Sequence, residues 1–217
     1  MTSGPLGSDA VLHGFFRSSA SYRVRIALNL KGLAYDNASY RLARQDQRGP
    51  AYLAINPQGL VPALTFGGQV LTQSLAICEY LDEVHPEPAL LPADPLARAH
   101  VRAAAQVIAC DIHPVQNLKI LHRLRALNIA EDDVTQWART TIEEGFDALV
   151  ALLPERDSDF CFGETPSLAD LCLVPQLANA RRFGVDLRWN RLLAIEANCQ
   201  ALDAFSKAAP ENQPDAV

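Results

Sequence analysis

The sequence lacks the features that mark membrane, secreted and nucleic-acid-binding proteins. It has no apolar run of about 18 residues, and no leader in which a charged stretch, an apolar stretch and a small-residue cleavage site follow one another. We therefore expect a protein that is neither secreted nor membrane-spanning. Positive charge is also scarce, because the net charge is −6, and a surface of that sign repels phosphates. We expect neither nucleic acids nor anionic membranes as partners.

Cysteine is present but forms no binding pattern. The five cysteines include no CxxC pair and no regular spacing, and most lie in apolar runs, where a free thiol packs as a small hydrophobic group. They are Cys78, Cys110, Cys161, Cys172 and Cys199. This pattern predicts reduced thiols in the cytoplasm and no metal site.

The chain begins with the pattern of a strand followed by a helix. Its 217 residues, 49% of them hydrophobic, are enough for one large or two ordinary domains with a sizeable core. Residues 10–15 predict a buried strand, and the stretch from about Ser19 to Lys31 predicts a helix that stops at Gly32. A second strand is expected at about 34–40. Residues 1–8 are left out, because "SGPLGS" resembles a cloning remnant.

A hairpin and another helix follow. Residues 63–66 and 69–71 flank Gly67-Gly68, a pair that supplies the positive φ angles of a two-residue turn. Ser74 then stands where it can cap a helix with apolar residues at helical spacing from Ile77 to Val84.

A proline-rich stretch divides the chain. Four prolines fall within residues 86–95, which neither a helix nor a central strand tolerates. We therefore predict a first domain at 9–85, a linker at 86–95 and a helical domain at 96–217. Asp94 and Pro95 should open its first helix, which is expected to bend at Pro114.

Ser167 and Asp170 have the spacing of a helix cap. Asp170 stands three residues after Ser167 and is a carboxylate analogue of the capping-box partner. Capping explains both residues, so we assign them to structure alone.

The order of these elements resembles a cytosolic glutathione transferase over nearly the whole chain. "RSSASYRVRIALNLKG" is similar to the zeta class, which includes maleylacetoacetate and maleylpyruvate isomerases, although Ala20 replaces the usual Cys. "CDIHPVQNLKIL" and "PQLANARRF" look like the bacterial maleylpyruvate isomerase branch. The resemblance implies an α/β thioredoxin-like N-terminal domain followed by an all-α C-terminal helical domain.

The hydroxyl groups before the first helix have two interpretations. Ser18 and Ser19 can satisfy N–H groups at the helix start, which would justify them without any further role. The resemblance adds glutathione as the cofactor. Its thiol is mostly protonated at neutral pH, and a hydroxyl donor at a helix N-terminus would favour the thiolate. Ser18 is thus the expected catalytic residue, together with Arg17.

The resemblance implies further contacts with glutathione. A cis Pro62 would expose the backbone of Val61 to pair with the cysteinyl segment, and a helix N-terminus suits the γ-glutamyl carboxylate. His113 and Asn117 are expected one turn apart on a helix facing the same site. The complete predicted set of glutathione contacts is Ser18, Ser19, Gln47, Val61, Pro62, Gln73, Ser74, His113 and Asn117.

Three cations are predicted to hold the substrate. The resemblance places Lys119 and Arg182 over the sulfur site, beside which Arg17 lies in sequence. Solvated helix charges are the alternative for all three, and the preferred interpretation for Arg23 and Arg25.

The expected activity is glutathione-dependent cis–trans isomerisation of a maleyl keto acid in aromatic catabolism. The substrate is a small dicarboxylate, with maleylpyruvate favoured over maleylacetoacetate, and the thiolate would add to its double bond and leave after rotation. The resemblance also implies a cytoplasmic homodimer. Two alternatives stay open: a conjugating or dehalogenating glutathione transferase, and a non-catalytic binding protein of the same fold.

Overall fold

The computed structural model describes residue 6 and residues 9–155 and 158–216, so most of the "SGPLGS" segment lies outside the described residues. The chain divides into two compact units. The first comprises Met1–Leu90 together with Gln200–Val217, and the second comprises Leu91–Cys199. The division between Leu90 and Leu91 falls inside the predicted linker 86–95. The last 18 residues, however, belong to the first unit and not to the helical domain predicted at 96–217.

A four-stranded sheet forms the centre of the first unit, with strand order β2-β1-β3-β4. β1 pairs in parallel with β2 and antiparallel with β3, and β3 pairs antiparallel with β4. Gly67 and Gly68 join the last two strands with φ angles of 51° and 73°, which confirms the predicted hairpin turn. The strands are β1 (Val11–Gly14), β2 (Asp36–Ser39), β3 (Ala63–Phe66) and β4 (Gln69–Thr72).

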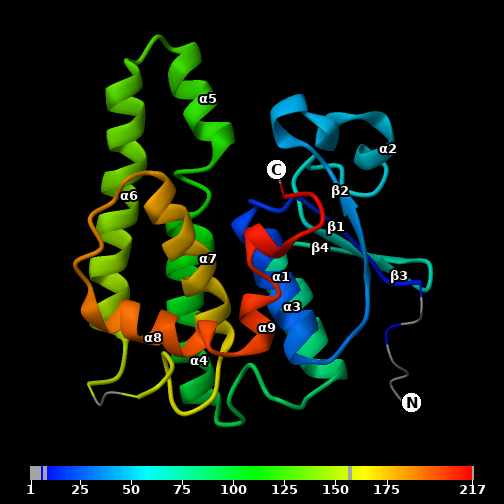
Figure 1. The fold of residues 1–217 in the computed structure, drawn as a ribbon, viewed down its shortest axis with the longest axis vertical. Helices are drawn as coiled ribbons and strands as arrows, with labels where there is room; N and C mark the ends of the chain where they lie inside the picture. Colours follow the sequence, from blue (N-terminus) through cyan, green and yellow to red (C-terminus); the bar gives the residue numbers. More distant parts are fainter. Residues whose placement is uncertain (1–5, 7–8, 156–157, 217) are drawn as a thin grey trace. The chain divides into compact units, whose positions relative to one another are not determined.

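Two helices, α1 (Ser19–Leu30) and α3 (Ser74–Val84), pack against each other beside this sheet (Figure 1). Apolar side chains such as Leu12 of β1, Leu64 of β3 and Ile77 of α3 are at most 1% exposed, so the core lies between strands and helices. The connection from β2 to β3 contains the short helix α2 (Pro50–Leu53) and two 3₁₀ turns, Leu42–Arg44 and Asp46–Arg48.

The predicted cap of α3 is wrong by one residue. Gln73 is the N-cap residue, with φ of 69° and no side-chain capping bond, and Ser74 is the first residue of the helix. The Ser74 Oγ instead accepts a hydrogen bond from Nη1 of Arg23, at 3.3 Å. A tertiary partner therefore uses the hydroxyl that the local sequence offered as a cap.

The C-terminal segment runs along α1 (Figure 1). It contains α9 (Asp203–Ser206) and the 3₁₀ turn Pro210–Asn212. Three side chains of α1 donate hydrogen bonds to backbone carbonyls of this segment, which explains why the segment belongs to the first unit. The bonds are Tyr22 Oη to Phe205 O at 3.3 Å, Arg25 Nε to Ala208 O at 2.8 Å and Asn29 Nδ2 to Ala204 O at 3.0 Å.

The second unit is helical, as predicted. α4 packs against α7, and the π-helical segment Val107–Ile112 that continues α4 packs against α6. The Asp170 carboxylate accepts bonds from both the N–H and the hydroxyl of Ser167, so the predicted capping box is present. The helices are α4 (Pro95–Gln106), α5 (Leu118–Ala126), α6 (Glu131–Leu152), α7 (Leu168–Arg182) and α8 (Asn190–Gln200).

The bend expected at Pro114 is instead an interruption. The π-helical segment ends at Ile112, and α5 begins only at Leu118. Proline has no N–H to continue the helix. Close packing holds the π-helical segment in place, because a Cβ on Gly145 of α6 would lie 2.2 Å from Cγ1 of Ile112.

All five cysteines have free thiols, as predicted, and only Cys110 is exposed. Within the described part of the chain, no helix combines the length and apolarity needed to cross a bilayer.

Candidate functional site

Ser18 lies at the N-terminus of α1, directly after the loop that leaves β1. Its backbone is extended, with φ of −68° and ψ of 115°, and its Oγ accepts a hydrogen bond from the N–H of Ser21 at 3.1 Å. That bond occupies the oxygen as an acceptor, and no acceptor for the O–H is found among the residues that the structure describes. A half-buried hydroxyl at the positive end of a 12-residue helix can therefore donate to an anion.

The neighbours of Ser18 differ in exposure. Ser19 and Ala20 are buried in the first turn of α1, with 6% and 8% of their surface exposed. Arg17 is exposed, and its guanidinium lies 4.9 Å from the centroid of the Phe16 ring. At this helix start, Arg17 and Ser18 are thus the residues whose polar groups are not buried.

The loop before β3 presents backbone groups. The Val61–Pro62 bond is cis, as the resemblance implied. The Leu60 carbonyl accepts bonds from Tyr52 Oη at 2.6 Å and Asn56 Nδ2 at 2.7 Å. In a trans peptide, the C=O of Leu60 and the N–H of Val61 point in opposite directions. Two side chains that hold this carbonyl therefore turn the N–H away from them, and within the described residues that N–H has no partner.

Burial also affects the hydroxyl that holds this loop. It raises the pKa of Tyr52 to about 12, so the phenol stays protonated and can donate to Leu60 at every physiological pH. The loop geometry is therefore insensitive to pH in that range.

The N-terminus of α3 is open and has a buried cation behind it. Gln73 donates from Nε2 to Oε1 of Gln58 at 2.8 Å instead of capping the helix. Ser74 accepts from Arg23, and no acceptor for its O–H is found among the described residues. Arg23 is only 2% exposed, and its Nε and Nη2 have no partner among the described residues. Helix end and guanidinium together make this a strongly positive location.

The interpretation of Arg23 and Arg25 as solvated charges is wrong. Each is 2% exposed, and Arg25 donates to the carbonyls of Ala208 and Phe16. Burial lowers the pKa of Arg25 to about 10, which still leaves it charged at neutral pH. Arg23 is the residue of this site that sequence reasoning missed. The available signal was its position between apolar residues on a helix without a polar face.

Gln47 lies in the 3₁₀ turn Asp46–Arg48 of the first unit. The side chain is half-buried, and its Oε1 is a buried acceptor without a partner in the described part of the chain. Such an atom is rare in a folded protein and suggests a missing donor. No contact links Gln47 to Ser18 or Ser74, so the structure does not test its predicted role.

In the second unit, His113 and Asn117 are neighbours across a turn, and not one turn apart on a helix as predicted. Asn117 caps α5, accepting from the N–H of Lys119 at 3.1 Å, and its Nδ2 lies 3.3 Å from Nε2 of His113. Capping thus explains Asn117 completely. The Lys119 side chain is exposed.

Lys119 and Arg182 lie on neighbouring segments of the second unit. Leu121, two residues after Lys119, and Phe183, directly after Arg182, pack against the same hydrophobic cluster. Arg182 is exposed at the end of α7, and its Nη1 donates to Oδ1 of Asn179 at 3.3 Å. Arg17 belongs to the first unit, so its relation to these two cations stays a prediction.

Comparison with known proteins identifies the two halves of the chain. Residues 17–84 match the N-terminal domain of glutathione S-transferase, and residues 99–207 match its C-terminal domain. The chain is 50% identical to a maleylpyruvate isomerase from a Ralstonia species, over 95% of this chain and 99% of that protein.

Two solved structures are similar throughout. One is the holo structure of maleyl pyruvate isomerase, described as a bacterial zeta-class glutathione S-transferase, with a TM-score of 0.92 and 49% identity over 95% of this chain and 100% of that one. The other is maleylacetoacetate isomerase from Methylobacterium extorquens AM1 with bound malonate and glutathione, with a TM-score of 0.91 and 40% identity over 95% and 99%.

Proposed function

The chain belongs to the glutathione S-transferase family, and from that premise we propose that it is a glutathione-dependent cis–trans isomerase of a maleyl keto acid. Maleylpyruvate is the substrate we expect first and maleylacetoacetate second, because similar proteins carry both names. The structural observation that carries the proposal is the Ser18 hydroxyl, which stands at the N-terminus of α1 with its proton uncommitted.

The groups of the first unit fit glutathione. Glutathione has a thiol, a peptide backbone and two carboxylates, and when bound it supplies a nucleophilic thiol for reversible addition to the cis double bond. The Ser74 hydroxyl, backed by the unpartnered Arg23 nitrogens at the start of α3, suits a carboxylate. The N–H of Val61, turned outward by Tyr52 and Asn56, suits an extended peptide. We assign Gln47, Gln73 and Pro62 to the rim of the same site.

Ser18 is proposed to donate to the sulfur. A hydroxyl bond and the partial positive charge of the helix end both favour an anion over a neutral thiol, which increases the thiolate fraction at neutral pH. Ser19 is buried and takes no direct part in this assignment. Ala20 adds no polar group, so the chemistry we propose does not need a cysteine at that position.

Cations are proposed to hold the substrate. The substrate is a dianion, and a protein of net charge −6 must concentrate positive charge where it binds. Arg17, Lys119 and Arg182 have exposed cationic side chains in the segments we assign to that task. One similar protein binds malonate as well as glutathione, which supports recognition of a dicarboxylate. Positive groups that face developing charge on oxygen stabilise the transition state more than the ground state.

We also propose a cytoplasmic homodimer. Five free cysteines, four of them buried, suit a reducing compartment. Light scattering of the purified protein would measure its mass, and a monomer at micromolar concentration would contradict the dimer.

Ultraviolet absorbance with maleylpyruvate or maleylacetoacetate, with and without glutathione, tests the activity. We expect the cis substrate to disappear only when glutathione is present, while titration of free thiol shows no loss over many turnovers. Stoichiometric loss of thiol would instead identify a conjugating transferase, and no reaction with either substrate would contradict the proposal.

A further inference from the structure

The backbone of Phe16 is held on both sides by charged side chains, one of them from the C-terminal segment. Its N–H donates to Oδ2 of Asp215 at 3.1 Å, and its C=O accepts from Nη2 of Arg25 at 3.0 Å. Phe16 is two residues before Ser18, in the loop between β1 and α1. Most peptide groups of a connecting loop face water, so charge-assisted bonds to two successive ones are unusual.

Both holding groups are themselves anchored. Asp215 Oδ2 also accepts from the hydroxyl of Ser39 on β2, and Arg25 donates from Nε to the carbonyl of Ala208 at 2.8 Å. The Arg25 guanidinium lies 5.3 Å from the centroid of the Tyr22 ring. The C-terminal segment thereby connects β2, α1 and the loop within the first unit (Figure 1).

Each charge matches the backbone group that it meets. The Asp215 carboxylate faces the N–H of the Phe15–Phe16 peptide, and the Arg25 guanidinium faces the C=O of the Phe16–Arg17 peptide, so both bonds are charge-assisted. Arg25 is charged at neutral pH despite its burial, and the negative charge of Asp215 favours that charged form. The arrangement therefore restrains the orientations of the two peptide groups that flank the Cα of Phe16 more strongly than neutral hydrogen bonds would.

The loop leaves little freedom between the backbone of Phe16 and the helix. Only Arg17 separates Phe16 from Ser18, and the N–H of Ser18 donates to the carbonyl of Phe15 at 3.0 Å. We propose that Asp215 and Arg25 are positioning residues, which hold the backbone on both sides of Phe16 and thereby aim the Ser18 hydroxyl and the Arg17 side chain. This inference rests on the proposed role of Ser18 toward the glutathione thiol.

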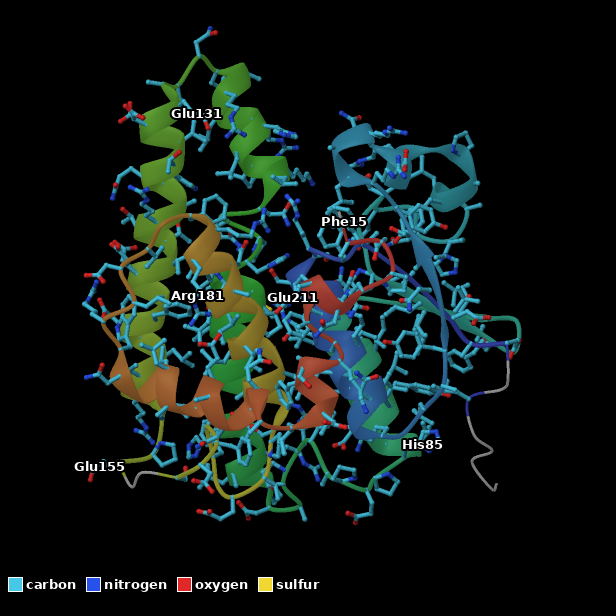
Figure 2. All side chains as sticks on the ribbon, viewed as in Figure 1. Phe15, His85, Glu131, Glu155, Arg181 and Glu211 are labelled. Carbon is cyan, nitrogen blue, oxygen red and sulfur yellow. The ribbon has the colours of Figure 1, made fainter. Side chains whose placement is uncertain are left out.

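The test compares three variants of the full-length protein. Asp215→Ala removes the acceptor, Asp215→Asn keeps an acceptor without the charge, and Glu211→Ala removes an exposed charge from the same segment, at a residue labelled in Figure 2. Ultraviolet titration of the thiolate in the complex with glutathione reports on the Ser18 geometry without any substrate. The Kd for glutathione, kcat and the melting temperature complete the set.

We expect Asp215→Ala to raise the pKa of the bound thiol by about one unit and to lower kcat about tenfold, because misorientation of a positioned group costs rate. The Kd for glutathione should change less than about threefold, since its carboxylate site is elsewhere. Asp215→Asn should recover most of both losses, and Glu211→Ala should match the wild type.

Several results would overturn the proposal. One is a wild-type thiol titration in Asp215→Ala, and another is an equal effect of Glu211→Ala. A lower melting temperature with unchanged thiol pKa and kcat would show a purely structural role. If Asp215→Ala does not fold, Ser39→Ala removes one anchor of the carboxylate and should shift the thiol pKa in the same direction by a smaller amount; no shift would contradict the inference. The titration needs no isomerase activity, so a failure of the proposed reaction remains distinguishable.

Discussion

The helix N-termini of the two units use the same residue type in different ways. In the second unit, Ser167 precedes α7 and gives its hydroxyl proton to Asp170, a carboxylate that also accepts from the N–H of Cys161 at 2.8 Å. In the first unit, Ser18 and Ser74 only accept, from the N–H of Ser21 and from the Arg23 guanidinium.

The difference lies in where each hydroxyl proton is directed. At α7 the fold itself consumes the donor, and Asp170 is 0% exposed, so this helix start cannot serve a ligand. At α1 and α3 the acceptor side is occupied and the donor side is open. A serine at a helix start therefore indicates a ligand site only when its oxygen accepts a hydrogen bond from the protein and its O–H has no acceptor there.

The largest effect should come from removal of the carboxylate that accepts the hydrogen bonds at the start of α7. Asp170→Ala removes three hydrogen bonds from a buried carboxylate and leaves their donors unsatisfied, and we expect a loss of about 3 kcal/mol or more in the free energy of unfolding. Urea unfolding measures it. Asp203→Ala, at the exposed start of α9, is the matched control and should leave the midpoint nearly unchanged. If Asp170→Ala lowered the free energy of unfolding less than Ser18→Ala does, the contrast between the two helix N-termini would be contradicted.

Removal of the proposed substrate cations should affect catalysis and leave stability intact. Arg17→Ala and Arg182→Ala should each lower kcat/KM for maleylpyruvate by roughly tenfold to a thousandfold, through loss of a charge-assisted pair. Lys119→Ala should be milder, because an ammonium fixes a carboxylate less rigidly than a guanidinium does. The Kd for glutathione, measured by calorimetry, should change far less. Equal losses in glutathione binding, or unchanged isomerisation, would show that these are ordinary surface charges.

Ser18→Ala should separate activity from stability. We expect kcat to fall at least about tenfold, equivalent to roughly 1.4 kcal/mol of transition-state stabilisation, while the lost cap costs about 1 kcal/mol of unfolding free energy. Steady-state kinetics at saturating glutathione and thermal unfolding check both numbers. Ala20→Cys is the control and should change little. Full activity of Ser18→Ala would remove this residue from the mechanism.

The proposed role of the N-terminus of α3 in glutathione binding can be tested by changing Arg23, the buried cation next to it. Arg23→Lys keeps a buried charge but loses the defined bond to Ser74, so KM for glutathione should rise about threefold to tenfold, with kcat at saturation within about twofold. Ser74→Ala removes the same bond from the other side. If the two residues act together, the double variant should be little worse than either single one; fully additive effects would show independent roles.

The smallest expected effect is a pH dependence at α7. Burial raises the pKa of the Asp170 carboxyl above its ordinary value, so the fold favours its protonated form. Its contribution to stability is then complete below the unfolded pKa of about 3.9 and is lost as the pH rises through the folded pKa. The cost of Asp170→Asn should therefore be larger near pH 4 than at pH 7. Urea unfolding of both proteins across this range measures the difference, and a cost that decreases toward acid would reverse the sign.

Local patterns were enough to predict most elements of the fold. The Gly67-Gly68 hairpin, the helix ending near Gly32 and the capping box at Asp170 depend on interactions within a few residues, and the structure confirms them. Ser18 was found in the same way, because a helix start is a local feature. The cis bond before Pro62 was implied by family resemblance and not by local physics.

The failures have a common physical cause. Ser74 was expected to cap α3, Arg23 and Arg25 to face solvent, and the last residues to join the helical domain. In each case the partner is distant in sequence: Arg23 for Ser74, the carbonyls of the C-terminal segment for Arg25, and α1 for that segment. Spacing along a chain carries no information about such partners.

By itself, then, the sequence determined which segments become strands and helices and which helix starts carry hydroxyl groups, since these follow from periodicity, turn residues and caps within one or two turns of chain. Only the tertiary structure decided which partner the Ser74 hydroxyl takes and which arginines are buried. The Ser74 oxygen accepts from Arg23, which is 51 residues away in the sequence, and a guanidinium is desolvated only when another segment covers it.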